Sequence, residues 1–422
     1  MRKVQDIDTT AAAAVEAPIA ATPAHGALFT VFRHRSYRLF FTGQLISLLG
    51  FWIQAIAQSW LVYRLTDSSL LLGLVVFANQ SPVLLFSPFA GVIADRLERR
   101  RVLFVTQGAM MASACILSVL TLTGVVHVWH IVLFAFLTGT ANAFDVPTRQ
   151  SFTIEMVGRA DLPRAIAVNS IMFNTARLVG PAIAGLLVAA IGEGWCMAIN
   201  GASYIAVLTS LAVMRVEKQP PRAPSHPLHD LREGIVYVAT HAPTRTLLLL
   251  LAGSSLFGTS YLTLMPVFAR DVLHGGSDAL GFLMAAVGCG ALLGAIGISR
   301  IPHHVLPRMP FASAVVFGLS LIAFSQSTSW PLSLALLVPA GLGMMGQGVS
   351  TNTLLQSSIA DALRGRVMAY YVMAFIGMVP ISALVSGWAS HIIGAPTTLA
   401  IGGAMVVVLA ALAFVRGVRG EK

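Results

Sequence analysis

Long runs without any Asp, Glu, Lys or Arg constrain the fold of this chain more than any other feature of its sequence. A helix that crosses a lipid bilayer needs about 20 apolar residues. Only helices and closed barrels satisfy all backbone hydrogen bonds in lipid, and these runs are far too long for barrel strands. The runs therefore predict an all-α polytopic membrane protein.

Twelve transmembrane helices are expected from the lengths of these runs. The runs long enough for one helix are Leu39–Tyr63, Ser68–Ala94, Ala165–Ile191 (interrupted only by Arg177), Gly194–Met214, Thr246–Ala269 and Ala279–Ser299. The runs long enough for two are Val102–Phe144, Met309–Ala360 and Val367–Val415, with turns expected near Val125–Trp129, Ser325–Pro331 and Ile393–Pro396. Six helices precede a polar segment and six follow it, which predicts two pseudo-symmetric six-helix bundles.

This division gives the expected domains. They are a disordered cytoplasmic tail at 1–27, a first bundle at 28–214, a cytoplasmic linker at 215–245 and a second bundle at 246–422. The linker opens with a cluster of prolines, and Leu228–Thr240 is expected to form a short surface helix.

The composition argues against several other classes of protein. Hydrophobic residues make up 56% of the 422 residues and charged residues only 10%, whereas a soluble domain carries about 25% charged residues. The net charge of +10 does not indicate nucleic acid, because all but Arg64, Arg177 and Arg270 of the 27 basic residues are dispersed over segments expected inside the cell. This asymmetry predicts that both termini are cytoplasmic. Three scattered cysteines favour neither a disulfide framework nor a metal site.

An internal repeat is expected from two equivalent loops. Ala160-Asp161-Leu162-Pro163-Arg164 follows the fourth predicted helix, and Ala360-Asp361-Ala362-Leu363-Arg364 follows the tenth, 200 residues later. Two six-helix halves are a known plan for transporters, whose binding site lies near the midplane where the halves meet.

The loop between the second and third predicted helices carries a specific motif. It reads Gly91-Val-Ile-Ala-Asp95-Arg96-Leu-Glu98-Arg99-Arg100-Arg101. It resembles the signature loop of the major facilitator superfamily, Gly-x-x-x-Asp-Arg-x-Gly-Arg-Arg, and departs from it at Glu98. Further segments resemble the bacterial branch that includes the enterobactin exporter; they are Phe32–Phe40, Gly43–Gly50, Trp60–Tyr63, Thr66–Ser68, Ala143–Gln150 and Ala176–Gly185.

The resemblance implies alternating access by rocking of two bundles in the bacterial inner membrane, usually driven by protons. It assigns conformational gating to Asp95, and Gly91, Arg96 and Arg99 share that loop. For Arg99, Arg100 and Arg101 the favoured interpretation is an anchor to lipid phosphate. Gly180, Pro181 and Gly185 resemble the exporter-type motif of the superfamily and favour efflux, whereas their simpler role is close helix packing.

Two charged residues are expected within the membrane. Arg177 lies near mid-depth, where a bare charge costs at least about 3 kcal/mol, so it should be paired or face a water-filled cavity. Asp145 is the nearest acidic candidate, and Arg149 follows it by one turn. The sequence leaves open a structural ion pair or a role in substrate binding and proton coupling, and Asp145 is the preferred protonation site.

Uncharged polar residues in the predicted helices are candidates for the substrate pathway. They include Gln54, Gln58, Asn79, Asn142, Asn174, Tyr261, Gln347 and Asn352. For each of them, a hydrogen bond between helices is the simpler role.

Two apparent motifs do not indicate a cofactor. Gly341-Leu-Gly343-Met-Met-Gly346 matches a dinucleotide fingerprint, but it lies inside an apolar run with no preceding strand, so its glycines more plausibly pack helices, as do Gly288, Gly290, Gly294 and Gly297. His127 and His130 lack further ligands nearby, so we expect neither a metal nor a cofactor.

The sequence thus predicts a proton-coupled exporter of small amphipathic molecules, siderophores or drug-like compounds, with protons and membrane lipids as further partners. An importer or facilitator of the same fold and a lysolipid transporter or flippase remain alternatives. A membrane-embedded enzyme would need a paired acid and base within the bilayer, where only Asp145 is found.

Overall fold

A computed structural model describes residues 29–214 and 227–420, apart from the side chains of residues 87–96, 227–233, 361–362 and 417–420. The predicted tail at 1–27 lies outside the described residues. Helices account for nearly all of the described chain, which contains no strand. The elements are η2 (Phe29–Arg33), α2 (Arg35–Thr66), α3 (Ser69–Arg96), α4 (Arg99–Leu122), α5 (Val128–Val213), α6 (Pro227–Thr240), α7 (Ala242–Gly258), α8 (Ser260–Val267), η3 (Phe268–Val272), α9 (Ser277–Ser299), η4 (Leu306–Arg308), α10 (Met309–Ser325), α11 (Trp330–Ser358), α12 (Asp361–Phe375), α13 (Val379–Ile393) and α14 (Ala395–Gly420).

The longest helix, α5, is divided at two glycines. Gly158 has φ 73° and Gly192 has φ 82°, in the left-handed region that glycine adopts without a steric penalty. They divide α5 into a first segment (128–157), a second segment (159–191) and a third segment (193–213). Ten helical stretches of the described residues are long and apolar enough to cross a membrane, with α5 counted once. Counting its three segments separately gives twelve, the number expected from the sequence.

The turns inside the three double runs agree with the sequence prediction. Residues 123–127 separate α4 from α5, residues 326–329 separate α10 from α11, and Gly394 separates α13 from α14. The short helix predicted in the linker is α6.

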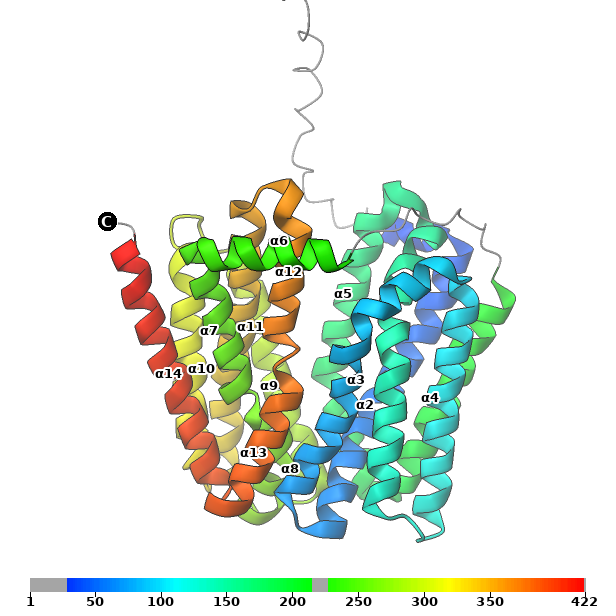
Figure 1. The fold of residues 1–422 in the computed structure, drawn as a ribbon. Helices are drawn as coiled ribbons and strands as arrows, with labels where there is room; N and C mark the ends of the chain where they lie inside the picture. The colour runs from blue at the N-terminus through cyan, green and yellow to red at the C-terminus, as the bar shows by residue number, and fades with distance from the viewer. Residues whose placement is uncertain (1–28, 215–226, 421–422) are drawn as a thin grey trace, which may run out of the picture.

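The helices form two bundles that stand side by side (Figure 1). Helices α2 to α5 make up the first bundle and α7 to α14 the second, and α6 lies across one end of the molecule. We call this the linker end, and it also holds Glu98 and Gly158; the opposite end, with Asp67 and Gly192, is the far end. The ribbons of the two bundles diverge toward the linker end and come together at the far end (Figure 1).

Glycine allows helices within a bundle to pack with their backbones in contact. A Cβ on Gly290 would lie 1.8 Å from the carbonyl oxygen of Val338, and one on Gly341 would lie 2.0 Å from that of Val287, so α9 and α11 tolerate no side chain at either position. This contact confirms the packing role predicted for these glycines. Gly297 differs, since nothing lies within 4 Å of the Cβ position there.

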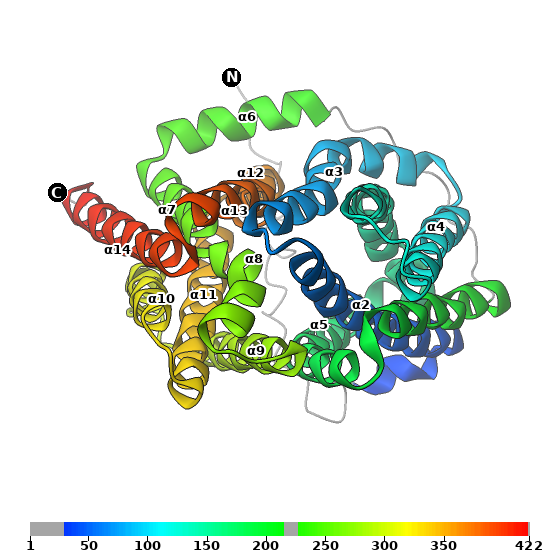
Figure 2. The same ribbon diagram turned by 90° about the horizontal axis from the view of Figure 1, so that it is seen from below.

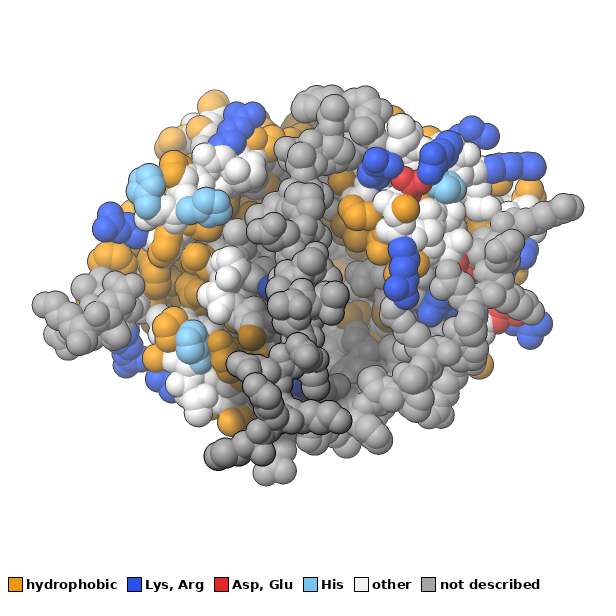
Figure 3. Space-filling model, turned by 90° about the horizontal axis from the view of Figure 1, so that it is seen from above, with side chains coloured by type: hydrophobic (Ala, Val, Ile, Leu, Met, Phe, Trp, Pro, Cys, Tyr) orange, Lys and Arg blue, Asp and Glu red, His pale blue; other side chains and the backbone are white. Residues whose placement is uncertain are grey.

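The outer surface is apolar along the helices and basic at the linker end. Large hydrophobic side chains such as Val105 and Leu249 are 70% and 61% exposed, as expected for residues that face lipid rather than water. Viewed from the linker end, arginine and histidine side chains lie over both bundles (Figure 3). The exposed basic and histidine side chains of this end include Arg33, Arg35, Arg38, Arg101, Arg159, Arg300, His303, His304 and Arg308.

Candidate functional site

The two bundles meet through two close helix crossings that begin at the far end. In the first crossing α3 packs on α13, and these helices lie side by side when the molecule is seen from the far end (Figure 2). A Cβ on Gly73 would lie 2.3 Å from the carbonyl oxygen of Ala383, and one on Gly387 would lie 2.6 Å from that of Ser69. The Ser69 hydroxyl donates a hydrogen bond of 3.1 Å to the carbonyl oxygen of Gly387.

The second crossing repeats this arrangement between the second segment of α5 and α9. A Cβ on Gly185 would lie 2.5 Å from the carbonyl oxygen of Ser277, and one on Gly281 would lie 2.5 Å from that of Pro181. The Ser277 hydroxyl donates a hydrogen bond of 3.3 Å to the carbonyl oxygen of Gly185. We call the two crossings together the far-end seal. The seal tolerates no side chain larger than hydrogen at its four glycines.

A polar cluster lies at the far end beside the seal and also joins the bundles. The Tyr63 hydroxyl of α2 donates a short hydrogen bond to the Asp271 carboxylate of η3. Arg270 forms an ion pair of 2.5 Å with Asp67 and lies over the Tyr63 ring at 5.5 Å from its centroid. The Arg64–Glu193 pair at 2.7 Å is confined to the first bundle.

Arg177 lies deeper than the seal, eight residues before Gly185 and hence about 12 Å closer to the linker end. Its backbone contacts α9, since a Cβ on Gly288 would lie 2.9 Å from the Arg177 carbonyl oxygen. Tyr261 of α8 lies within electrostatic range of its guanidinium. The Arg177 Nη2 atom is buried and has no hydrogen-bond partner among the described residues.

The predicted pairing of Asp145 with Arg177 is wrong. Asp145, which is 1% exposed, accepts hydrogen bonds from Thr106 Oγ1 at 3.0 Å and Gln107 Nε2 at 2.8 Å, and forms an ion pair of 3.4 Å with Arg149. The carboxylate therefore points toward α4 inside the first bundle, whereas Arg177 borders the second bundle. Sequence spacing gives the depth of a residue but not the neighbour that its helix face meets.

Several residues predicted to line the pathway instead bond neighbouring helices. Gln54 accepts a hydrogen bond of 2.6 Å from Asn200, Asn79 donates one of 3.2 Å to the Ala135 carbonyl oxygen, and Gln347 donates one of 2.9 Å to Ser254. These three contacts agree with the simpler role considered for them.

Two of the other pathway candidates bond within one helix, Tyr261 bonds a neighbouring helix, and two are partly exposed. Asn174 donates to the carbonyl oxygen of Ser170, and Asn352 accepts from Gln356, in each case one turn away. Tyr261 is buried and donates to the Met344 sulfur at 3.4 Å. Gln58 and Asn142 are half-buried.

The gating loop is only partly described. Gly91, Asp95 and Arg96 belong to the last turns of α3, and the predictions for their side chains lie outside the described residues. Arg99, the first residue of α4, forms an ion pair of 2.5 Å with Glu155 at the end of the first segment of α5. This pair fixes the beginning of α4 to the linker end of the first bundle.

Asp161 belongs to the segment predicted as a repeated loop, but it lies in the first turn of the second segment of α5, where it has several partners at the linker end. It forms ion pairs with Arg33 at 2.8 Å and Arg164 at 2.5 Å, and a contact of 2.8 Å with His34 Nε2. These partners stabilise the carboxylate, the His34 hydrogen bond most of all, and lower the pKa of Asp161 to about 2.

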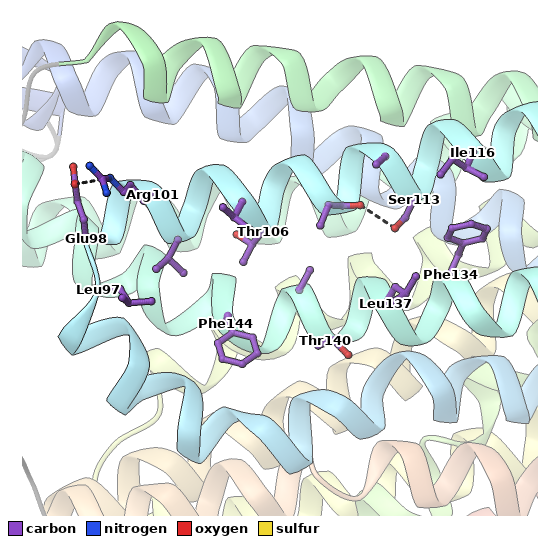
Figure 4. Close-up of a pocket in the computed structure, with 15 residues that line it drawn as sticks. Leu97, Glu98, Arg101, Thr106, Ser113, Ile116, Phe134, Leu137, Thr140 and Phe144 are labelled. Carbon is purple, nitrogen blue, oxygen red and sulfur yellow. Dashed lines mark hydrogen bonds and ion pairs between the residues drawn. The ribbon is translucent and has the colours of Figure 1, made fainter.

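An apolar pocket of about 760 Å³ opens between α4 and the first segment of α5 (Figure 4). Glu98 and Arg101, paired at 2.9 Å, lie at one end of it, and Ile116 and Phe134 lie at the other. All of its lining residues belong to the first bundle or the turn before α4. The pocket is therefore lateral and separate from the contact between the bundles.

Sequence reasoning missed Ser69, Gly73, Ser277 and Gly281 of the seal, as well as Trp52. A signal was available for the seal, because Ser69-x-x-x-Gly73 and Ser277-x-x-x-Gly281 repeat at the same separation of 208 residues. Trp52 carries no such signal, since one tryptophan in an apolar helix is ordinary.

Known proteins are similar to this chain in sequence and in fold. The family described as "Transmembrane secretion effector" matches residues 26–420. The chain is 27% identical to the staphyloferrin A transporter of Staphylococcus aureus over 87% of this chain and 92% of that protein. It is 25% identical to the enterobactin exporter EntS of Escherichia coli O1:K1 / APEC over 79% of this chain and 80% of that protein.

A solved structure has the same fold. The inward-facing, unoccupied crystal structure of a bacterial homolog of the human lysosomal transporter Spinster superposes with a TM-score of 0.68 at 14% sequence identity, over 94% of this chain and 97% of that one.

Proposed function

Because the chain belongs to the transmembrane secretion effector family of the major facilitator superfamily, we propose that it is a proton-coupled exporter of siderophores or drug-like amphipathic molecules. Family and relatives make it a multi-pass membrane transporter of small molecules rather than an enzyme. Export as the direction is supported by the enterobactin exporter among the relatives and by the resemblance of the segment around Gly180 and Gly185 to an exporter-type motif. The bacterial inner membrane is the expected location.

The far-end seal is the observation that carries this proposal. Its two crossings are related by the internal repeat, so one rocking motion of the bundles would open both at once. Among the glycines of the described residues that contact the opposite bundle, Gly288 and Gly377 lie nearest the linker end, at the middle of the helices; the Cβ position of Gly377 lies 3.0 Å from Leu84. We assign this arrangement to an inward-open state, with the basic linker end in the cytoplasm.

Asp145 is the proposed proton site. As a carboxylate it is balanced by Arg149, and as a neutral acid it needs a hydrogen-bond acceptor instead. Gln107 Oε1 is buried and has no partner among the described residues, so a half-turn of the Gln107 amide would supply that acceptor. Protonation would release Arg149 from its partner and change the contacts of the first segment of α5.

The test is transport by the purified protein in proteoliposomes with an imposed pH gradient, with enterobactin, staphyloferrin A and ethidium as probes. We expect wild-type protein to move at least one probe against its gradient. D145N should reduce this transport to the level of empty liposomes while exchange of the probe without a gradient continues, because the binding site remains and only the coupling is lost.

The matched control is D278N, which removes a carboxylate from the first turn of α9 at the far end. It should transport like the wild type. Unchanged gradient-driven transport by D145N would remove Asp145 from the mechanism. Counterflow by the wild type in inverted vesicles without any gradient-driven movement would instead favour the facilitator alternative.

The lateral pocket is the observation that favours a second candidate, a lysolipid transporter whose substrate enters between helices. Its apolar lining and its charged pair at the linker end match an acyl chain with a zwitterionic headgroup. The test is movement of a fluorescent lysolipid between leaflets by the purified protein. Movement that enterobactin, staphyloferrin A and ethidium do not inhibit would favour this function over export.

A further inference from the structure

Arg177, a half-buried cation of the described helices, has no balancing carboxylate. Inside the first bundle Arg149 pairs with Asp145, and at the far end Arg64 and Arg270 pair with Glu193 and Asp67. Arg177 forms no ion pair with any described residue, and Tyr261 of the second bundle lies within electrostatic range of it. An unbalanced charge in the membrane interior is costly, and residues that carry one usually serve a substrate or ion pathway.

A second unpartnered donor belongs to α2, whose Trp52 packs on α5 one turn from Arg177. The indole Nε1 of Trp52 is buried and, like Arg177 Nη2, has no partner among the described residues. The Trp52 side chain packs on Gly180, where a Cβ would lie 2.8 Å from both its Cβ and its Cγ. Gly180 follows Arg177 by three residues and so lies on the same face of the helix. Both groups can only donate hydrogen bonds, so what they lack is an acceptor.

The position of the two donors places that acceptor between the bundles. Arg177 and Trp52 belong to the first bundle, whereas Gly288 and Tyr261 approach Arg177 from the second. The far-end seal at Gly185 and Gly281 lies about 12 Å away along the helix, on the far-end side. A molecule bound to these two donors would contact the first bundle and face the second. It would lie at the depth in the membrane where the two bundles begin to separate.

A buried apolar cluster adjoins one of the two donors, Trp52. Leu48, Met172 and Ala176 form a buried cluster against which Trp52 packs. A single guanidinium balances one negative charge, and its planar fork suits the two oxygens of a carboxylate. Neither a multiply charged phosphate nor a cation matches these surroundings.

We infer that Arg177 and Trp52 form an anion site that binds the carboxylate of an organic monoanion with an apolar body, and that the transported molecule carries this group. The inference rests on the proposed transport function, because it places the site on the transport pathway. It narrows the substrate class from amphipathic molecules in general to amphipathic monoanions.

The test is binding to the full chain in detergent, measured by calorimetry and thermal unfolding. The probes are salicylate, indole-3-acetate and octanoate, each compared with its neutral amide. We expect the wild type to bind at least one anion about tenfold more tightly than the matching amide, because charge-assisted hydrogen bonds are lost in the amide. R177Q should abolish this preference, R177K should keep part of it, and R300Q, at an exposed position after α9, should leave it unchanged.

Two outcomes would overturn the inference. One is a wild type that prefers none of the three anions over its amide, and the other is a preference that persists in R177Q. If R177Q is too unstable to purify, W52F is tested instead. This variant keeps the Arg177 charge and an aromatic ring at position 52 but removes the indole N–H donor. W52F must weaken binding of the anion and leave binding of the amide unchanged; an unchanged anion affinity overturns the site.

Transport assays separate this inference from the proposed function. Anion binding that depends on Arg177, together with no gradient-driven export of any probe, would refute export and leave the site standing. Gradient-driven export of ethidium at equal rates by wild type and R177Q, together with no preference for anions, would refute the site and leave export standing.

Discussion

Asp161 illustrates how one carboxylate joins two segments of chain at the linker end. Arg33 and His34 reach it from the start of the first bundle, and Arg164 reaches it from the next turn of its own helix. Nearby, the Tyr37 hydroxyl donates to Asn169 at 2.9 Å, which reinforces the same contact between α2 and the second segment of α5. The sequence marked this loop through its repeat 200 residues later, but it did not give the partners.

The low pKa of Asp161 makes a prediction about stability against pH. A pKa of about 2 in the folded protein lies below the usual 3.8, so folding favours the charged form. The stabilisation is fully present above pH 3.8 and is lost as the pH falls toward 2. We expect the difference in thermal unfolding temperature between wild type and D161N in detergent to be constant near neutral pH and to shrink below pH 4. A difference that stays constant down to pH 3 would contradict this linkage.

Arg177 and Asp145 show the limit of inference from single residues. Both were found from the sequence because charges are rare in apolar runs. Their partners were not found from the sequence, because the partner of Asp145 depends on how the first segment of α5 is rotated toward α4. Arg177 belongs to the second segment of α5, which borders the second bundle.

Among the helices, the crossings of the far-end seal depend on glycine at four positions. A Cβ on Gly281 would lie 2.5 Å from a backbone oxygen, which cannot move as the end of a flexible side chain can. Overpacking of this kind costs about 1–3 kcal/mol. The cost applies only while the seal is closed, so it acts on the conformational equilibrium rather than on folding as a whole.

The predicted result for G281A is a shift away from the inward-open state. Spin labels at Leu65 of α2 and Asp278 of α9, in a protein without its native cysteines, should report a longer distance across the far end than in the parent. Transport should fall because one half of the cycle is disfavoured. G297A is the matched control, since it lies in the same helix and has nothing within 4 Å of its Cβ position. Equal label distances in G281A and G297A would refute the role of the seal.

At the scale of the whole molecule, the two bundles form a pair of similar units joined at one end. The charged cluster of Tyr63, Asp67, Arg270 and Asp271 adds to the seal, but Asp67 is 71% exposed, so water screens its pair with Arg270. Tight packing of helix backbones, rather than these ion pairs, therefore contributes most to closure of the far end.

The distribution of charge predicts the orientation of the molecule in the membrane. Green fluorescent protein fused to either terminus should fluoresce in the cytoplasm, and alkaline phosphatase fused within the turn at 123–127 should be active outside it, because basic residues are retained on the cytoplasmic side. Termini on opposite faces of the membrane would contradict the even number of crossings on which the two-bundle arrangement depends.

The sequence by itself determined the helices, their approximate ends, the turns within the double runs and the family. These depend on local hydropathy and on motifs that are continuous along the chain. Only the tertiary structure decided the pairing of Asp145 with Arg149, the serine and glycine contacts of the seal, and the two donors at Arg177 and Trp52 that lack an acceptor. The physical reason is that lipid is as apolar as a helix interface, so a transmembrane sequence is hydrophobic on every face and does not record which face meets another helix.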